Sequence, residues 1–156
     1  TDERKGTEVN MQIPLMPLFS LDFETEKTYA DNIKKIFVLD DSKTTIMYFK
    51  NLLSKQGYSV TISDNPKEAL NQLKNERFDL LISDIEMPHL NGAELVSKLK
   101  GCEETKDLPV LIISMLNMDR AKELFKDTAV DALLSKSELD EKNVLATVKQ
   151  ILKNKA

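Results

Sequence analysis

The sequence predicts an α/β fold in which helices pack on both faces of a parallel β-sheet. From residue 35 onward, short apolar runs alternate with segments of helical periodicity. This alternation is typical of parallel strands joined by crossover helices. Five such units fit between residues 35 and 154. With 41% hydrophobic residues, a chain of 156 residues can bury a core of its own.

Five strands are expected from the short apolar runs. The first, third and fourth are nearly continuous in apolar residues, which is typical of central strands that are buried on both faces. The expected strands span residues 36–39, 58–62, 79–83, 109–114 and 131–135.

The helices are predicted from apolar residues at helical spacing and from the residues at their ends. The first should stop before Gly57, because glycine suits the left-handed position that follows a helix. The second should begin at Asn65 and Pro66, since proline is favoured at the first helical position. The expected helices span residues 43–56, 92–100, 118–126 and 139–153, together with the one that begins at Pro66.

Residues 1–34 are interpreted as an N-terminal arm or interdomain linker, and residues 35–154 as the folded domain. The apolar stretch at 11–23 contains Pro14 and Pro17, which disfavour a regular helix. The chain starts without Met and without the pattern of a signal peptide. We therefore expect it to be a fragment of a longer protein.

The composition argues against several classes of protein. No segment approaches the roughly 20 apolar residues that a membrane span needs. A net charge of −4 gives no basic surface for nucleic-acid phosphates. One cysteine and one histidine cannot form an internal disulfide or a Cys/His zinc site. The single cysteine indicates a reducing, cytoplasmic compartment.

Chemistry-bearing residues follow the ends of four expected strands. Asp40 and Asp41 follow the first strand, Asp84 the third, Ser114 ends the fourth and Lys136 follows the fifth. Ligand sites of open parallel sheets lie at this edge, although each residue alone is commonly a cap, a turn residue or a surface charge. Converging carboxylates repel one another unless a cation is present. A site of oxygen ligands suits Mg²⁺.

These residues resemble the receiver domain of bacterial two-component response regulators. The resemblance covers residues 35–154 and rests on Val-Leu-Asp-Asp-Ser at 38–42, Ser-Asp-Ile-Glu-Met-Pro-His-Leu-Asn-Gly at 83–92, Ile-Ser at 113–114 and Ser-Lys at 135–136. It implies a flavodoxin-like fold, a doubly wound (βα)5 sandwich with a parallel five-stranded sheet in the order 2-1-3-4-5.

The resemblance also implies a phosphorylation-controlled signalling switch, not an enzyme, that assists its own phosphorylation and dephosphorylation. Asp84 would accept a phosphoryl group from a histidine kinase or phosphotransfer protein. Mg²⁺ would be bound by Asp41, Asp84 and the backbone carbonyl of Glu86, and by Asp40 largely through a water.

Lys136 and Ser114 would then contact phosphoryl oxygens. The state would be transmitted through the face formed by the fourth helix, fifth strand and fifth helix to an output domain in the same or another chain. The sequence leaves open whether activation forms a homodimer.

Three positions depart from the family pattern. Leu133 stands where an aromatic switch residue is usual, so rotation of a ring cannot be the readout. Ser137 replaces a proline that usually follows a cis bond, and a cis bond before another residue costs about 2.5–4 kcal/mol. A trans bond is therefore favoured here. Met115 replaces a small residue and is expected to hinder small phosphodonors or the hydrolytic water.

Other functions fit the residues less well. Residues 42–45 superficially resemble a flavin phosphate loop, but the two carboxylates before them would repel the phosphate. A haloacid-dehalogenase-type phosphatase needs Asp-x-Asp, whereas Asp40 and Asp41 are adjacent, and a P-loop motif is absent. The alternative that we keep is a phosphorylation-independent docking or dimerisation module with the same fold.

Overall fold

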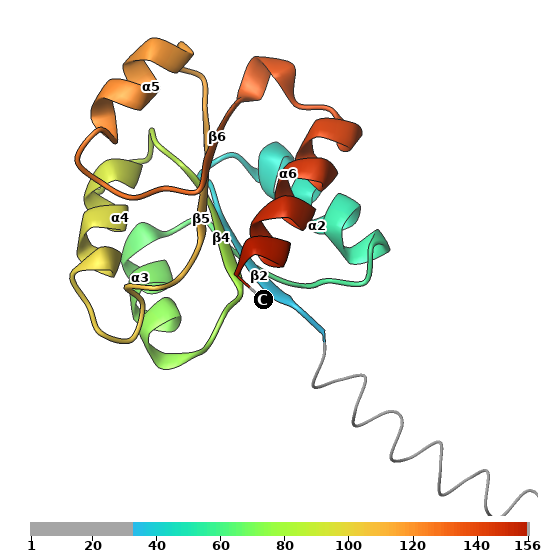
Figure 1. Cartoon of the computed structure of the whole chain (residues 1–156), viewed down its shortest axis with the longest axis horizontal. Coiled ribbons are helices and arrows are strands. Elements are labelled where there is room, and N and C mark those ends of the chain that lie inside the picture. The colour runs from blue at the N-terminus through green and yellow to red at the C-terminus, as the bar shows by residue number, and fades with distance from the viewer. Residues whose placement is uncertain (1–32, 156) are drawn as a thin grey trace, which may run out of the picture. The chain divides into compact units, whose positions relative to one another are not determined.

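The computed structural model describes residues 33–155, which form a five-stranded parallel sheet with helices on both faces (Figure 1). The strand order is β3-β2-β4-β5-β6, which is 2-1-3-4-5 when the strands are counted along the described chain. The predicted fold class and strand order are confirmed. The predicted arm lies almost entirely outside the described residues, so that interpretation stays a prediction.

All five expected strands are present, and each end lies within one residue of its predicted position. The strands are β2 (Lys35–Leu39), β3 (Ser59–Ser63), β4 (Leu80–Asp84), β5 (Val110–Ser114) and β6 (Ala132–Ser135). The three apolar strands, β2, β4 and β5, occupy the centre of the sheet, as their composition predicts.

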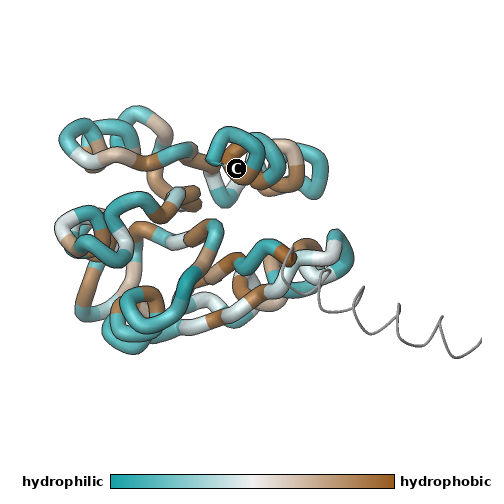
Figure 2. The backbone as a smooth tube through the Cα atoms, turned by 60° about the horizontal axis from the view of Figure 1, so that its bottom comes forward, coloured by the Kyte–Doolittle hydropathy of each residue, from teal (hydrophilic) through white to brown (hydrophobic). Residues whose placement is uncertain are grey.

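The crossover helices are also those predicted, and two of the predicted ends are wrong by two residues. They are α2 (Lys43–Lys55), α3 (Pro66–Asn75), α4 (Gly92–Lys100), α5 (Met118–Leu124) and α6 (Glu141–Asn154), and a short 3₁₀ helix, η2 (Lys136–Glu138), follows β6. Along the tube in Figure 2, hydrophobic and hydrophilic residues alternate within the helices. No helix in the 33–155 portion is long and apolar enough to cross a bilayer.

The prediction that the last helix begins at residue 139 is wrong. The Asp140 side chain accepts a hydrogen bond from the backbone N–H of Asn143 at 3.1 Å, so the helix begins after this cap. The fourth helix ends at Leu124 instead of Lys126. There the N–H of Phe125 bonds to the carbonyl of Lys122, three residues back, and this tighter hydrogen bond ends the α-helical pattern.

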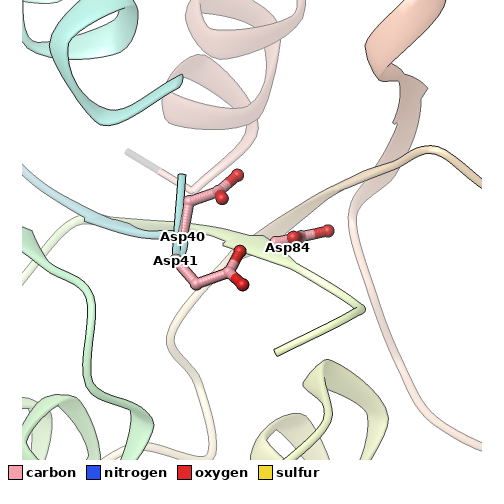
Figure 3. A group of neighbouring side chains, drawn as sticks. All are labelled: Asp40, Asp41 and Asp84. Atoms are coloured by element: carbon pink, nitrogen blue, oxygen red, sulfur yellow. The ribbon is translucent and has the colours of Figure 1, made fainter. Parts of the chain in front are cut away.

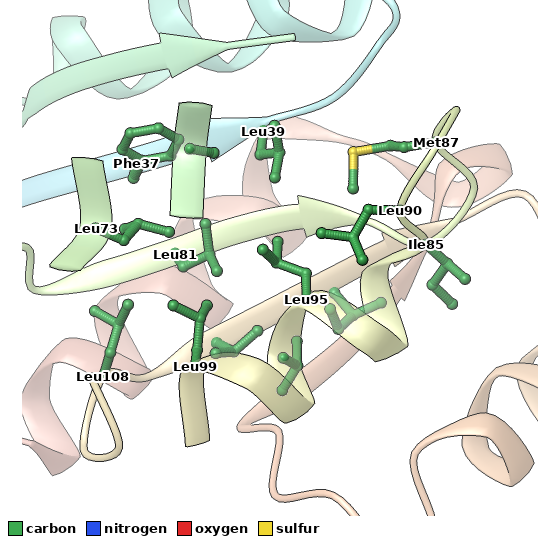
Figure 4. Packing of buried hydrophobic residues seen from close by; sticks show 14 of the residues in the cluster. Phe37, Leu39, Leu73, Leu81, Ile85, Met87, Leu90, Leu95, Leu99 and Leu108 are labelled. Carbon is green, nitrogen blue, oxygen red and sulfur yellow. The ribbon is translucent and has the colours of Figure 1, made fainter. Parts of the chain in front are cut away.

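Two hydrophobic clusters hold the layers together, one on each face of the sheet. Alternate residues of each strand point to opposite faces, so Phe37 and Leu39 join the cluster under α3, α4 and α5 (Figure 4). Ile36 and Val38 join the cluster under α2 and α6. Because both faces are covered, every residue of β4 and β5 is buried.

Candidate functional site

The parallel register brings the predicted acidic residues together at the carboxyl edge of the sheet. Leu39 of β2 pairs with Ser83 of β4, so the next residues, Asp40 and Asp84, lie beside each other. Asp41 completes the group, and carboxylate oxygens of all three residues lie within 4.8 Å of one another (Figure 3). The structure thus brings these three carboxylates together, as their positions after the strand ends predict.

Asp40 and Asp84 are buried, while Asp41 is exposed. One oxygen of Asp40 accepts the backbone N–H of Ser42 at 2.8 Å, and one of Asp84 accepts that of Glu86 at 3.3 Å. Burial nevertheless raises the pKa of both Asp40 and Asp84, because a charged carboxylate loses its hydration there.

Lys136 lies between the two buried carboxylates. Its Nζ is 2.8 Å from Oδ2 of Asp40 and donates a hydrogen bond to Oδ2 of Asp84 at 3.1 Å. Burial acts to lower the pKa of Lys136, but its contacts with Asp40 and Asp84 outweigh burial and raise the pKa. The sequence-based prediction assigned Lys136 to the phosphoryl group and missed its ion pairs with both Asp40 and Asp84.

The acidic group fits a hard divalent cation. Three carboxylates face one ammonium group, so the fully ionised cluster keeps an excess of negative charge. Oδ2 of Asp40 is buried, and the Lys136 ammonium lies 2.8 Å from it. All the donors are oxygens, which Mg²⁺ prefers in proteins.

Ser114 ends β5 and is buried close to this group of residues. Ser114 pairs with Ser135 in the sheet, and Lys136 is the next residue after Ser135. The Ser114 hydroxyl oxygen accepts the backbone N–H of Leu116 at 2.9 Å. Met115 follows with 68% of its surface exposed. The site edge therefore carries an exposed apolar side chain directly beside a buried hydroxyl.

The other two unusual positions lie in and just after β6. Leu133 is half-buried and packs against the cluster under α3, α4 and α5. The Lys136–Ser137 peptide bond is trans, as the sequence favours. The N–H of Ser137 bonds to the Ser135 hydroxyl at 3.3 Å, so a local turn holds the residues around Lys136 without a cis bond.

Two further features of the site were not predicted from the sequence. The backbone N–H of Ser42 donates a hydrogen bond to the Asp40 side chain. An Asp two residues before a helix-capping Ser is the sequence pattern that could have predicted this bond. His89, in the loop after β4, has a left-handed backbone with φ 71°. Such a conformation is uncommon outside glycine, and no sequence pattern around His89 predicts it.

Comparisons with known proteins agree with this geometry. A family model described as the response regulator receiver domain matches residues 36–153. The polar-differentiation response regulator DivK of Brucella anthropi is 27% identical over 103 residues, which are 66% of this chain and 84% of that protein.

Two solved structures show the same arrangement. The chemotaxis response regulator CheY4 of Vibrio cholerae is 26% identical, with a TM-score of 0.72 over 77% of this chain and 99% of that one. The signal receiver domain of a signal transduction histidine kinase from Syntrophus aciditrophicus is 28% identical. Its TM-score is 0.71, and the match covers 78% of this chain and 91% of that chain.

Proposed function

Because the chain belongs to the response regulator receiver domain family, we propose that it is a signalling switch that accepts a phosphoryl group on Asp84. The observation that carries the proposal is the contact of Lys136 with Asp84, in a group that also holds Asp40 and Asp41. This is a carboxylate nucleophile with a fixed positive charge beside it. Receiver domains are signalling domains and not enzymes in the usual sense.

The proposed reaction is a transfer from phosphohistidine to the Asp84 carboxylate. An oxygen of Asp84 attacks phosphorus, the phosphorus–nitrogen bond breaks, and the imidazole leaves and takes up a proton from water. The product is an acyl phosphate. Lys136 favours the ionised form of Asp84 and so opposes the effect of burial, and its ammonium would then donate to a phosphoryl oxygen.

Mg²⁺ would be held by Asp41, Asp84 and the backbone carbonyl of Glu86, with Asp40 acting largely through a water. When bound, it neutralises charge on the transferring phosphoryl group. The chain's own contribution is to fix the carboxylates. The N–H groups of Ser42 and Glu86 each hold one oxygen, which leaves the other oxygens directed at the site.

The signal would leave through α5, β6 and α6. The Ser114 hydroxyl accepts the N–H of Leu116, and its own proton is free to donate to a phosphoryl oxygen. Movement of Ser114 towards the phosphoryl group would draw Leu116 with it and shift the loop before α5. Within α5 only Ala121 is buried, so this helix is less firmly held than its neighbours. Leu133 would respond by packing and not by rotation of a ring.

The proposed partners are a histidine kinase or phosphotransfer protein and an output domain in the same or another chain. A cytoplasmic location is part of this proposal, and whether the phosphorylated form is a homodimer stays open. The alternative is a docking module that does not respond to phosphate. The contact between the partly buried Lys136 and Asp84 does not support it.

The experiment is phosphorylation by a phosphorylated phosphotransfer protein, measured by the mass of the intact chain with Mg²⁺ and with a chelator. We expect one added phosphoryl group with Mg²⁺, none with chelator and none in Asp84→Asn. Asp64→Asn, an exposed acid after β3, is the matched control and should behave like wild type. Undiminished phosphorylation of Asp84→Asn would contradict the proposal.

A further inference from the structure

Gly92 lies unusually close to the main chain of Asp84. A Cβ atom at Gly92 would be 2.4 Å from the carbonyl oxygen of Asp84 and 2.9 Å from Cα of Ile85. Both neighbours are backbone atoms at the end of a buried strand, so neither can turn aside as a flexible side chain would. Gly92 has no left-handed φ, so this close approach, not its backbone angle, is what excludes a larger residue.

Hydrogen bonds hold the same peptide. The hydroxyl of Ser83 donates to the Asp84 carbonyl oxygen at 3.0 Å, and the N–H of Gly92 donates to the carbonyl of Ile85 at 2.7 Å. Ser83, Asp84 and Gly92 are all buried. The main chain that carries the Asp84 carboxylate is therefore fixed by one neighbour in β4 and by the first residue of α4.

Helix α4 cannot easily retreat from this contact. The Asn91 side chain accepts the N–H of Glu94 at 2.9 Å and donates to the Glu94 carboxylate at 2.9 Å, which fixes the start of the helix. The inward face of α4 is anchored by Leu95 and Leu99, both fully buried. A methyl group at position 92 would thus push on the Asp84–Ile85 peptide more than on the helix.

We propose that Gly92 is a positioning residue, which acts with the Ser83 hydroxyl to set where the Asp84 carboxylate and the following carbonyl at Glu86 lie. This rests on the function proposed above for the role of those groups. The effect of Gly92 on the position of Asp84 does not itself depend on phosphorylation. The contact keeps the Asp84 carboxylate within reach of Lys136 and beside Asp41.

The test compares Gly92→Ala with Gly101→Ala at the other end of α4. A Cβ at Gly101 would meet only carbonyl oxygens of Ser97 and Lys98, at 3.5 and 3.6 Å, which is ordinary contact. We expect Gly92→Ala to weaken Mg²⁺ binding, measured by calorimetry, by about 10–100-fold, the usual effect of disturbing residues that orient metal ligands. Gly101→Ala should bind as wild type does.

A second readout needs neither metal nor phosphate. Residual dipolar couplings of the metal-free protein should show a reoriented Asp84–Ile85 peptide in Gly92→Ala and an unchanged one in Gly101→Ala. Failure of wild type to take up phosphate would refute the proposed function but leave this comparison intact. Wild-type Mg²⁺ affinity in Gly92→Ala, or an equal loss in Gly101→Ala, would overturn the positioning role.

If Gly92→Ala does not fold, Ser83→Ala tests the positioning proposal instead. This variant removes the hydroxyl that holds the Asp84 carbonyl and adds no bulk. We expect a folded protein whose Mg²⁺ affinity has fallen several-fold. A folded Ser83→Ala protein with wild-type affinity would overturn the proposal in that case.

Discussion

The Nζ atom of Lys136 lies 3.1 Å from Oδ2 of Asp84, although 52 residues separate the two in the chain. The same Nζ is 2.8 Å from Oδ2 of Asp40, so one lysine forms ion pairs with two buried carboxylates. The contact joins the end of the central strand β4 to the residue after the edge strand β6. Lys136 thus offsets part of the negative charge of the two buried carboxylates.

Lys136→Met should destabilise the metal-free protein at neutral pH, because it leaves two buried carboxylates without their cation. Removing one partner of a buried pair costs about 3–5 kcal/mol, and protonation of one aspartate would reduce that loss. Urea unfolding measures it. Lys126→Met is the control, since Lys126 pairs with Glu123 on the exposed surface at 2.8 Å and should matter little. Equal effects of the two substitutions would contradict the account.

Stability of the metal-free protein should fall as pH rises through the raised pKa values of Asp40 and Asp84. Between the ordinary aspartate pKa and the raised values, the folded protein keeps protons that the unfolded chain has lost. The folded state therefore loses stability as pH rises in this window. Urea unfolding across a pH series should show wild type losing stability relative to Asp84→Asn. A gain relative to that variant would reverse the sign and refute the prediction.

Mg²⁺ should raise the stability of wild type by mass action, by about 2.7 kcal/mol at a hundred times its dissociation constant. Asp41→Ala should lose most of this gain and block phosphorylation. The fold should remain intact, because Asp41 is exposed. Thermal melts with and without Mg²⁺ measure the gain, with Asp64→Ala as the control. If Asp41→Ala responds to Mg²⁺ as wild type does, the metal binds elsewhere.

Ser114→Ala should uncouple the site from α5 and β6. Fluoroberyllate mimics the acyl phosphate, and in wild type we expect amide shifts at the site, through residues 115–119 and into β6. In Ser114→Ala the changes should shrink beyond the site, because the hydroxyl that draws the loop inward is missing. Changes that stay at the loops around Asp41 and Asp84 in wild type, or that persist undiminished in the variant, would refute this route.

Much of the fold and the acidic site was predictable because it depends on local pattern and on sheet geometry. Apolar runs mark the buried strands, and the carboxyl ends of parallel strands meet at one edge, so Asp40, Asp41 and Asp84 had to converge. The lysine contacts were not predictable, because side-chain reach and burial decide them. The approach of Gly92 to Asp84 depends on how deeply α4 packs, which a sequence pattern does not encode.

The most direct test of the central claim locates the phosphate by chemistry. Borohydride reduction converts a phosphorylated aspartate into homoserine, which peptide mass spectrometry identifies at its position in the chain. After incubation with a phosphorylated phosphotransfer protein and Mg²⁺, we predict homoserine at Asp84 and unchanged aspartate at Asp40, Asp41 and Asp64. Homoserine at another aspartate, or acid-stable phosphate on Ser114, would contradict the account.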